Sequence, residues 1–144
     1  MGTTCLQCGA KLTPDETCSD WFNAAQLFEL EHPETYGAVH YLSVPCYLLQ
    51  HNAYSRLGWL AVYRLLHEFV YDDLHPEQAR RRMQRIMASS KRQWSLVKGP
   101  RLAGVENITW SFTIAEVRLD TAEHYQADVR AWAQAVLEDS AGLV

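Results

Sequence analysis

Residues 36–52 read YGAVHYLSVPCYLLQHN, a mostly apolar segment that carries His40, Cys46 and His51. Its length and its low content of charged residues predict a helix across most of the segment. Pro45 lies inside it, where a proline removes one backbone hydrogen bond and crowds the preceding turn, so we expect a kink. Alternatively, Pro45 is the first residue of a shorter helix. In both cases residues 46–52 are helical.

Helical patterns also lie on both sides of this segment. Thr17 with Asp20 fits a capping box and predicts a helix that begins at Cys18 and stops at His32-Pro33, because the residue before proline avoids the helical region. A third helix, residues 56–71, is apolar on nearly all sides, which is typical of the buried centre of a domain.

Two further helices complete the pattern. Pro76 suits the first position of a fourth helix, which extends to about Lys91. Asp120 with Glu123 resembles a capping box and opens the last helix. Between these helices, residues 94–119 form a long irregular connection, in which residues 108–114 are either a short strand or a loop packed on its own aromatic side chains.

These patterns predict an all-α fold, roughly a five-helix bundle with an N-terminal zinc knuckle and one long irregular connection before the last helix. We expect a single domain over residues 1–144, in which a CxxCG knuckle at residues 1–16 packs on a helical bundle of residues 17–139. The 144 residues suit one domain, and we find no internal repeat or linker that would divide them.

The N-terminal sequence Cys5-Leu-Gln-Cys8-Gly has the spacing of a metal-binding knuckle. Two thiolates separated by two residues in a tight turn can bind one tetrahedral ion, and the small glycine lets the turn close. The alternative is a redox dithiol, which usually lies at the start of a helix. No helical pattern surrounds Cys5, so the sequence favours zinc.

Helix geometry supplies the two missing ligands. Cys18 opens the first helix, where the helix dipole stabilises a thiolate. The first helix is about 21 Å long at about 1.5 Å per residue, so an antiparallel return of the second helix brings His51 beside Cys18. His40 lies about 16 Å from His51 along that helix and cannot share the same ion. We therefore predict that Cys5, Cys8, Cys18 and His51 hold one Zn²⁺.

His40 and Cys46 are not part of this predicted zinc site. A histidine on an apolar helix is usually a core residue with one hydrogen bond, but His40 could also pair with Glu29 or Glu31 for proton transfer or as a second metal site. Cys46 lies among apolar neighbours and is expected to behave as a small buried apolar residue.

The composition limits the partners and the compartment. A net charge of −4 makes a nucleic-acid partner unlikely, and the four arginines at 80, 81, 82 and 85 are expected to form a solvated helix face. The sequence contains no apolar run of the roughly 20 residues that a membrane span needs, and its first residues do not resemble a secretory signal. We therefore expect a cytoplasmic protein.

The order of these motifs resembles a known family. CxxCG, a cysteine opening the first helix, YGAVHYLSVPCYLLQH, SRLGWLAVYRLLHEF, PEQARRRM and VRAWAQAV are together similar to domain of unknown function 5946, an uncharacterised family of small bacterial proteins. The resemblance covers most of the chain and implies a bacterial origin and a small cytosolic domain, but it implies no reaction.

Three functions fit these features. The first is a zinc-stabilised module that binds an unknown protein or small-molecule partner. The second is a metal-dependent enzyme with a bundle-core site near His40, using Glu29 or Glu31 and His67. The third is a thiol-based metal or redox sensor that releases zinc on oxidation. The sequence favours the first, because three thiolates and one imidazole complete a tetrahedral ion.

Overall fold

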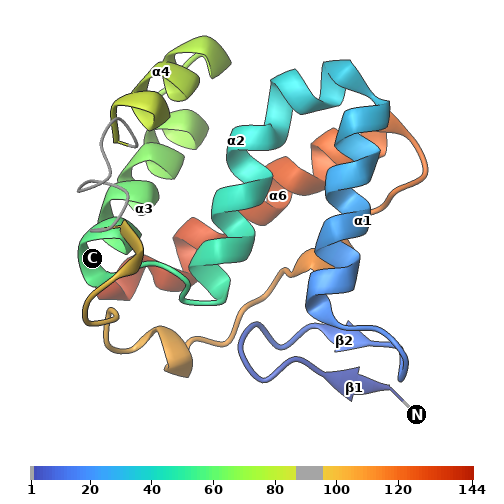
Figure 1. The fold of residues 1–144 in the computed structure, drawn as a ribbon, viewed down its shortest axis with the longest axis horizontal. Coiled ribbons are helices and arrows are strands. Elements are labelled where there is room, and N and C mark those ends of the chain that lie inside the picture. The colour runs from blue at the N-terminus through green and yellow to red at the C-terminus, as the bar shows by residue number, and fades with distance from the viewer. Residues whose placement is uncertain (1, 87–95) are drawn as a thin grey trace.

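The computed structural model describes residues 2–86 and 96–144, in which five α-helices and one short hairpin form the fold (Figure 1). The elements are β1 (Thr3–Thr4), β2 (Lys11–Leu12), α1 (Cys18–Glu31), α2 (Pro33–Gln50), α3 (Arg56–Tyr71), α4 (Pro76–Ile86) and α6 (Ala122–Ser140), with short 3-10 turns at Val105–Asn107, Ile114–Glu116 and Ala141–Leu143. The expected all-α, five-helix architecture is confirmed. None of the helices in these residues is both long and apolar enough to cross a bilayer.

Helix α2 occupies the centre of the fold and contacts α1, α3, α4 and α6 (Figure 1). The expectation that residues 56–71 form the buried centre is therefore wrong. Helix α3 buries one face, which includes Trp59 and Leu66, but Leu57 is 71 % exposed on the opposite side. Helix α3 carries apolar residues on nearly all of its sides, but neighbouring helices cover only one of these sides.

The ends of α1 and α2 place the two helices in antiparallel contact. Thr17 and Asp20 form the expected capping box, with the Asp20 amide donating to the Thr17 hydroxyl at 3.1 Å and the Thr17 amide to the Asp20 carboxylate at 2.9 Å. Helix α2 begins at Pro33, earlier than expected, so His32 alone separates the two helices. Pro45 lies within α2, which continues beyond it to Gln50, so a shorter helix beginning at Pro45 is not formed.

The caps of the later helices agree in part with the sequence patterns. Ser55 caps α3, but the cap of α6 is Thr121 and not Asp120. The Thr121 hydroxyl accepts from the His124 amide at 3.1 Å, while Asp120 accepts from the Thr121 amide at 2.7 Å. The backbone at Thr121 is extended, which directs its hydroxyl toward the first turn. The expected extension of the fourth helix to Lys91 lies outside the described residues.

The connection before α6 packs as a loop rather than as a strand. Trp110 is 8 % exposed, and the 3-10 turn at residues 114–116 lies against α1. The Gln50 side chain donates to the Phe112 carbonyl at 2.7 Å and accepts from the Trp132 indole at 3.1 Å. One buried amide of α2 thus joins the connection to α6. Trp94, expected to help pack this connection, lies outside the described residues.

Candidate metal centre

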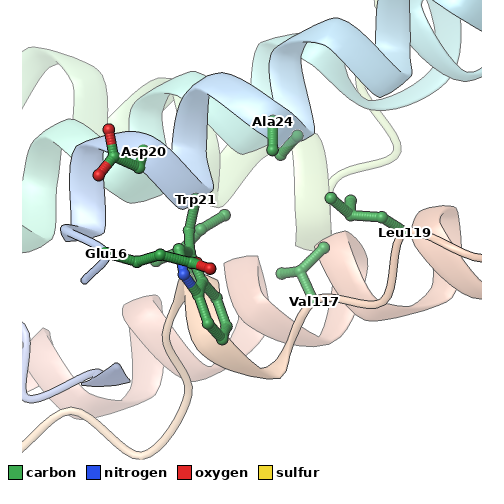
Figure 2. A pocket seen from close by; sticks show the side chains of 8 residues that line it. Glu16, Asp20, Trp21, Ala24, Val117 and Leu119 are labelled. Carbon is green, nitrogen blue, oxygen red and sulfur yellow. The ribbon is translucent and has the colours of Figure 1, made fainter. Parts of the chain in front are cut away.

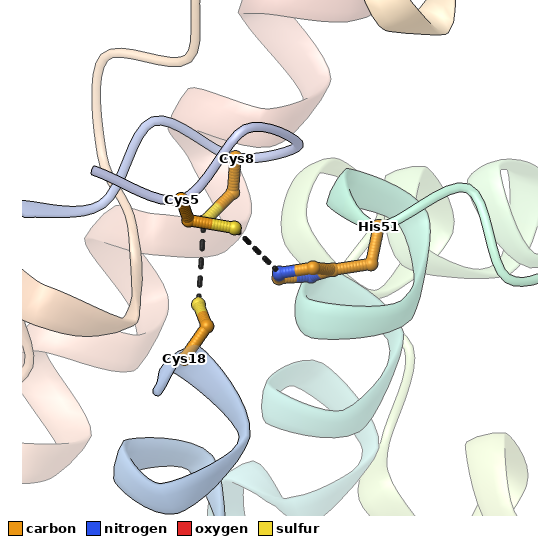
Figure 3. Close-up of side chains that lie close together, drawn as sticks. All are labelled: Cys5, Cys8, Cys18 and His51. Atoms are coloured by element: carbon orange, nitrogen blue, oxygen red, sulfur yellow. Dashed lines mark hydrogen bonds between the residues drawn. The ribbon is translucent and has the colours of Figure 1, made fainter. Parts of the chain in front are cut away.

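The hairpin β1–β2 closes the knuckle at the foot of α1. The Cys5 amide donates to the Ala10 carbonyl at 2.9 Å, and the Gly9 amide donates to the Cys5 carbonyl at 2.9 Å. Gly9 has a φ of 79°, in the left-handed region that glycine adopts without a side-chain clash. This turn places the Cys5 and Cys8 side chains close together (Figure 3).

The other two members of the cluster come from the ends of α1 and α2. Cys18 is the first residue of α1, and His51 is the residue that ends α2. The His51 imidazole is held at its Nδ1, which lies 2.7 Å from the Tyr47 carbonyl, and by stacking on the Tyr47 ring with centroids 4.1 Å apart. Since a carbonyl only accepts, Nδ1 carries a proton, and Nε2 is the nitrogen that faces the cysteines.

The four side chains predicted as ligands converge on one point (Figure 3). Their ligand atoms all lie within 4.8 Å of one another, with 3.7 Å between Cys5 Sγ and His51 Nε2 and 3.3 Å between Cys8 Sγ and Cys18 Sγ. Around a tetrahedral zinc ion, neighbouring sulfur and nitrogen ligands lie about 3.6 to 3.8 Å apart. The cluster therefore has the size and donor types of a metal site and could hold one ion.

Hydrogen bonds inside the cluster shift the pKa values of three of its members. The hydrogen bond with Cys18 lowers the pKa of Cys8 against the opposing effect of burial, and the same contact raises the pKa of Cys18. Burial lowers the pKa of His51, but hydrogen bonds with Cys8 and the Tyr47 carbonyl outweigh it and raise that pKa to about 9. A divalent cation can replace the protons that otherwise balance these sulfurs.

The cluster is only partly covered by the protein. Cys8 is 1 % and Cys18 is 7 % exposed, whereas Cys5 is half-buried. A surface opening of about 360 Å³ lies beside the cluster and is lined in part by Cys5, Cys18 and His51. Small molecules from solvent can therefore reach these three side chains.

His40 lies outside this cluster and pairs with Glu29. The His40 Nδ1 is 3.2 Å from one Glu29 oxygen, and the other oxygen accepts from Ser43 at 2.9 Å and from Tyr125 at 2.8 Å. Glu29 is fully buried and also accepts from Gln26 at 2.9 Å. Its carboxylate therefore joins α1, α2 and α6 through protein donors.

The buried hydrogen bonds of Glu29 could be predicted only in part from the sequence. Glu29 follows Ala25 by four residues on the apolar stripe of the first helix, which signals a buried acid in need of donors. The contribution of Tyr125 depends on a contact across 96 residues. Neither Glu31 nor His67 joins Glu29 and His40 in a metal-binding group within residues 2–86 and 96–144, where the Cys5 cluster is the only such group. Cys46 is fully buried, as expected.

A second concave feature lies at the start of α1. The cavity has a volume of about 310 Å³. Its walls include the apolar side chains of Trp21, Ala24, Val117 and Leu119, and the acidic residues Glu16 and Asp20 line it as well (Figure 2). The Trp21 indole nitrogen is buried and has no hydrogen-bond partner among the described residues. Glu16 also lines the opening beside the cysteine cluster, so one loop residue borders both features.

In this helical protein, the first helix, the second helix and the N-terminal hairpin meet at three cysteines and a histidine. The chain therefore belongs to the class of small helical proteins with a candidate metal centre. The sequence of the chain defines its family more closely. Residues 3–141 match the family of unknown function DUF5946, and the chain belongs to this family. No curated protein and no solved structure matches the chain.

Proposed function

We propose that this protein is a single-domain, zinc-stabilised binding module in which Cys5, Cys8, Cys18 and His51 hold one Zn²⁺. The observation that carries the proposal is the convergence of three sulfurs and one imidazole nitrogen within 4.8 Å. A set of three thiolates and one imidazole suits zinc, saturates its tetrahedral coordination and leaves no position for a reactive water. Such an ion stabilises structure rather than performing chemistry.

The ion would join the N-terminal hairpin to the helices. Residues 2–17 contribute few buried apolar side chains, chiefly Ala10 and Leu12, so packing alone holds this segment weakly. Bonds from the knuckle to Cys18 and His51 would fix it against both helices. The free state of the four cysteines is compatible with zinc binding in a reducing cytoplasm, where we place the protein.

The cavity in Figure 2, which we call the groove, is the proposed binding surface. Its apolar walls fit an apolar side chain, and the carboxylates of Glu16 and Asp20 fit a neighbouring basic one. The occupant is therefore a segment of a partner protein that presents a lysine or arginine beside an apolar residue. By contrast, Glu29 already accepts four hydrogen bonds or polar contacts from the protein, so we rank a metal-dependent enzyme with a site near His40 as the alternative.

Metal analysis and X-ray absorption test the zinc proposal. The purified protein should contain one equivalent of zinc, with sulfur ligands at about 2.3 Å and a nitrogen ligand at about 2.0 to 2.1 Å. A protein that neither contains nor takes up zinc, or a first shell made of oxygen, would refute it.

The groove can be tested with a peptide of alternating leucine and arginine, observed by the fluorescence of the protein. Binding should weaken in Leu119→Ala and in Glu16→Gln, whereas Glu106→Gln, an exposed acid outside the groove, serves as the control. Equal affinity for all variants would place the binding surface elsewhere.

A further inference from the structure

Two sulfurs of the cluster are close enough to react with each other. Cys8 Sγ and Cys18 Sγ lie 3.3 Å apart, and a disulfide bond needs about 2.05 Å. Cys8 belongs to the hairpin turn and Cys18 to the first turn of α1, so a small shift of the turn brings the two sulfurs to bonding distance. Neither cysteine is paired in the present structure.

The surroundings give an oxidant access to one partner of the pair. Cys18 lines the surface opening together with Cys5, whereas Cys8 is 1 % exposed and does not line it. A small oxidant can therefore enter the opening and meet the Cys18 sulfur, which lies 3.3 Å from the Cys8 sulfur. This is the arrangement of a thiol that the peroxide oxidises first and a second, resolving thiol that then forms the disulfide.

We propose that Cys8 and Cys18 are a redox-active pair, which a hydroperoxide converts into a disulfide with loss of the metal ion. The ion release rests on the zinc site proposed above, but the pairing of the two cysteines rests on their geometry alone. The inference thus adds a regulatory reaction to the proposed binding module.

The reaction balances in two steps. As a ligand of the proposed zinc ion, Cys18 would be a thiolate. Its sulfur attacks one peroxide oxygen, the O–O bond breaks, and the leaving alkoxide or hydroxide takes a proton, which leaves a sulfenic acid on Cys18. The Cys8 thiolate then attacks the Cys18 sulfur, the S–S bond forms, and the expelled hydroxide takes a second proton as water. Two electrons pass from the sulfurs to the peroxide, and Zn²⁺ leaves because two of its four ligands are lost.

The disulfide would have a different effect from simple removal of the ion. The disulfide still links the hairpin to α1, whereas Cys5 and His51 lose the zinc ion that they share. The Gln7 side chain, which donates to the His51 carbonyl at 3.2 Å, and the contact of 3.7 Å between Cys5 Sγ and His51 Nε2 would then join the turn to the end of α2. Oxidation therefore loosens the contact with α2 and keeps the contact with α1.

The test uses the full-length protein loaded with zinc and treated with increasing hydrogen peroxide. Remaining thiols are blocked by alkylation, the protein is digested without reduction, and peptides are identified by mass spectrometry, while a chromogenic chelator records released zinc. The expected result is a Cys8–Cys18 disulfide that forms in step with the release of one equivalent of zinc and disappears with dithiothreitol. Cys46→Ser serves as the matched control and should behave as the unchanged protein, because Cys46 is buried away from the opening.

The outcomes separate the two proposals. A Cys5–Cys8 disulfide, an intermolecular disulfide or over-oxidised cysteines without a disulfide would each overturn the pairing, whatever the zinc content. A Cys8–Cys18 disulfide in protein that binds no zinc would support the pairing and refute the zinc site. Cys5→Ser gives a second readout, since it keeps both members of the pair and should still form the Cys8–Cys18 bond. Trypsin should cleave at Lys11 faster in chelated protein than in oxidised protein, because only the oxidised form keeps the hairpin linked to α1.

Discussion

The phenol oxygen of Tyr125 lies 2.8 Å from a carboxylate oxygen of Glu29, although the two residues belong to the last and the first helix of the chain. Tyr125 and Glu29 are both fully buried. Burial, together with the nearby Glu29 charge, raises the pKa of Tyr125, so its hydroxyl keeps the proton that it donates. This contact holds α6 against α1 and satisfies an acid that has no access to water.

Tyr125→Phe should therefore destabilise the protein. The change keeps the ring and its packing but leaves the buried carboxylate with one donor fewer, so the free energy of unfolding should fall by about 1 to 3 kcal/mol. Urea unfolding followed by circular dichroism measures it. Tyr71→Phe, at a position 47 % exposed on α3, is the matched control and should change stability by less than about 0.5 kcal/mol. Similar losses in both variants would contradict the importance of the buried contact.

Leu66→Ala and Leu57→Ala together test the one-sided burial of α3. Leu66 is 1 % exposed and packs in the core, so its truncation should cost about 2 to 5 kcal/mol. Leu57 is 71 % exposed, so its truncation should cost less than about 0.5 kcal/mol in the same unfolding assay. If both changes were equally costly, α3 would be surrounded on all sides, as the sequence pattern suggested.

Single-residue changes also test which histidine belongs to the cluster. Cys18→Ser and His51→Ala should each weaken zinc binding by more than about tenfold, since even partners outside the ligand set affect metal affinity by that factor. His40→Ala should retain zinc, because His40 contacts Glu29 and not the cysteines. Competition with a chelating dye gives the affinities. Full zinc retention in His51→Ala with loss in His40→Ala would refute the assignment.

Removal of the metal should loosen the N-terminal segment before the helices. Hydrogen exchange should accelerate at the amides of Cys5 and Gly9, which the knuckle protects through hydrogen bonds, after treatment with a chelator. The amides of α2 and α6 should keep their protection, because their burial does not involve the cluster. A comparable acceleration throughout α2 would mean that the ion stabilises the whole bundle.

The arginines of α4 should not bind nucleic acid. Arg80 is paired with Glu77, and Arg82 with Glu68, so part of their charge is already balanced. Replacement of Arg80, Arg81 and Arg82 by glutamine should leave the unfolding free energy within about 0.5 kcal/mol, as is usual for surface positions. A labelled DNA duplex at low salt should show no binding to the unchanged protein. Binding that weakens steeply as salt rises would show instead that this face contacts phosphates.

Much of the fold and of the candidate site followed from local sequence signals. Thr17 and Pro76 predicted helix starts, because caps and first-turn prolines satisfy or avoid unpaired backbone amides within a few residues. The convergence of Cys18 and His51 could be predicted because a short turn and a fixed rise per residue determine where an antiparallel helix returns. The predicted cap of the last helix, Asp120, lies one residue before the actual cap, Thr121. Both residue types are good caps, and only the backbone conformation decides between them.

The sequence by itself determined the helices, the four members of the cysteine–histidine cluster and the buried state of Cys46, because each depends on neighbours within one or two turns or on the fixed rise of a helix. Only the tertiary structure decided that α2 and not α3 lies at the centre, that Tyr125 completes the partners of Glu29, and that Cys8 and Cys18 are 3.3 Å apart. The physical reason is that these contacts join segments far apart in the chain. Their distances depend on how whole helices pack, and no local pattern of residues encodes that packing.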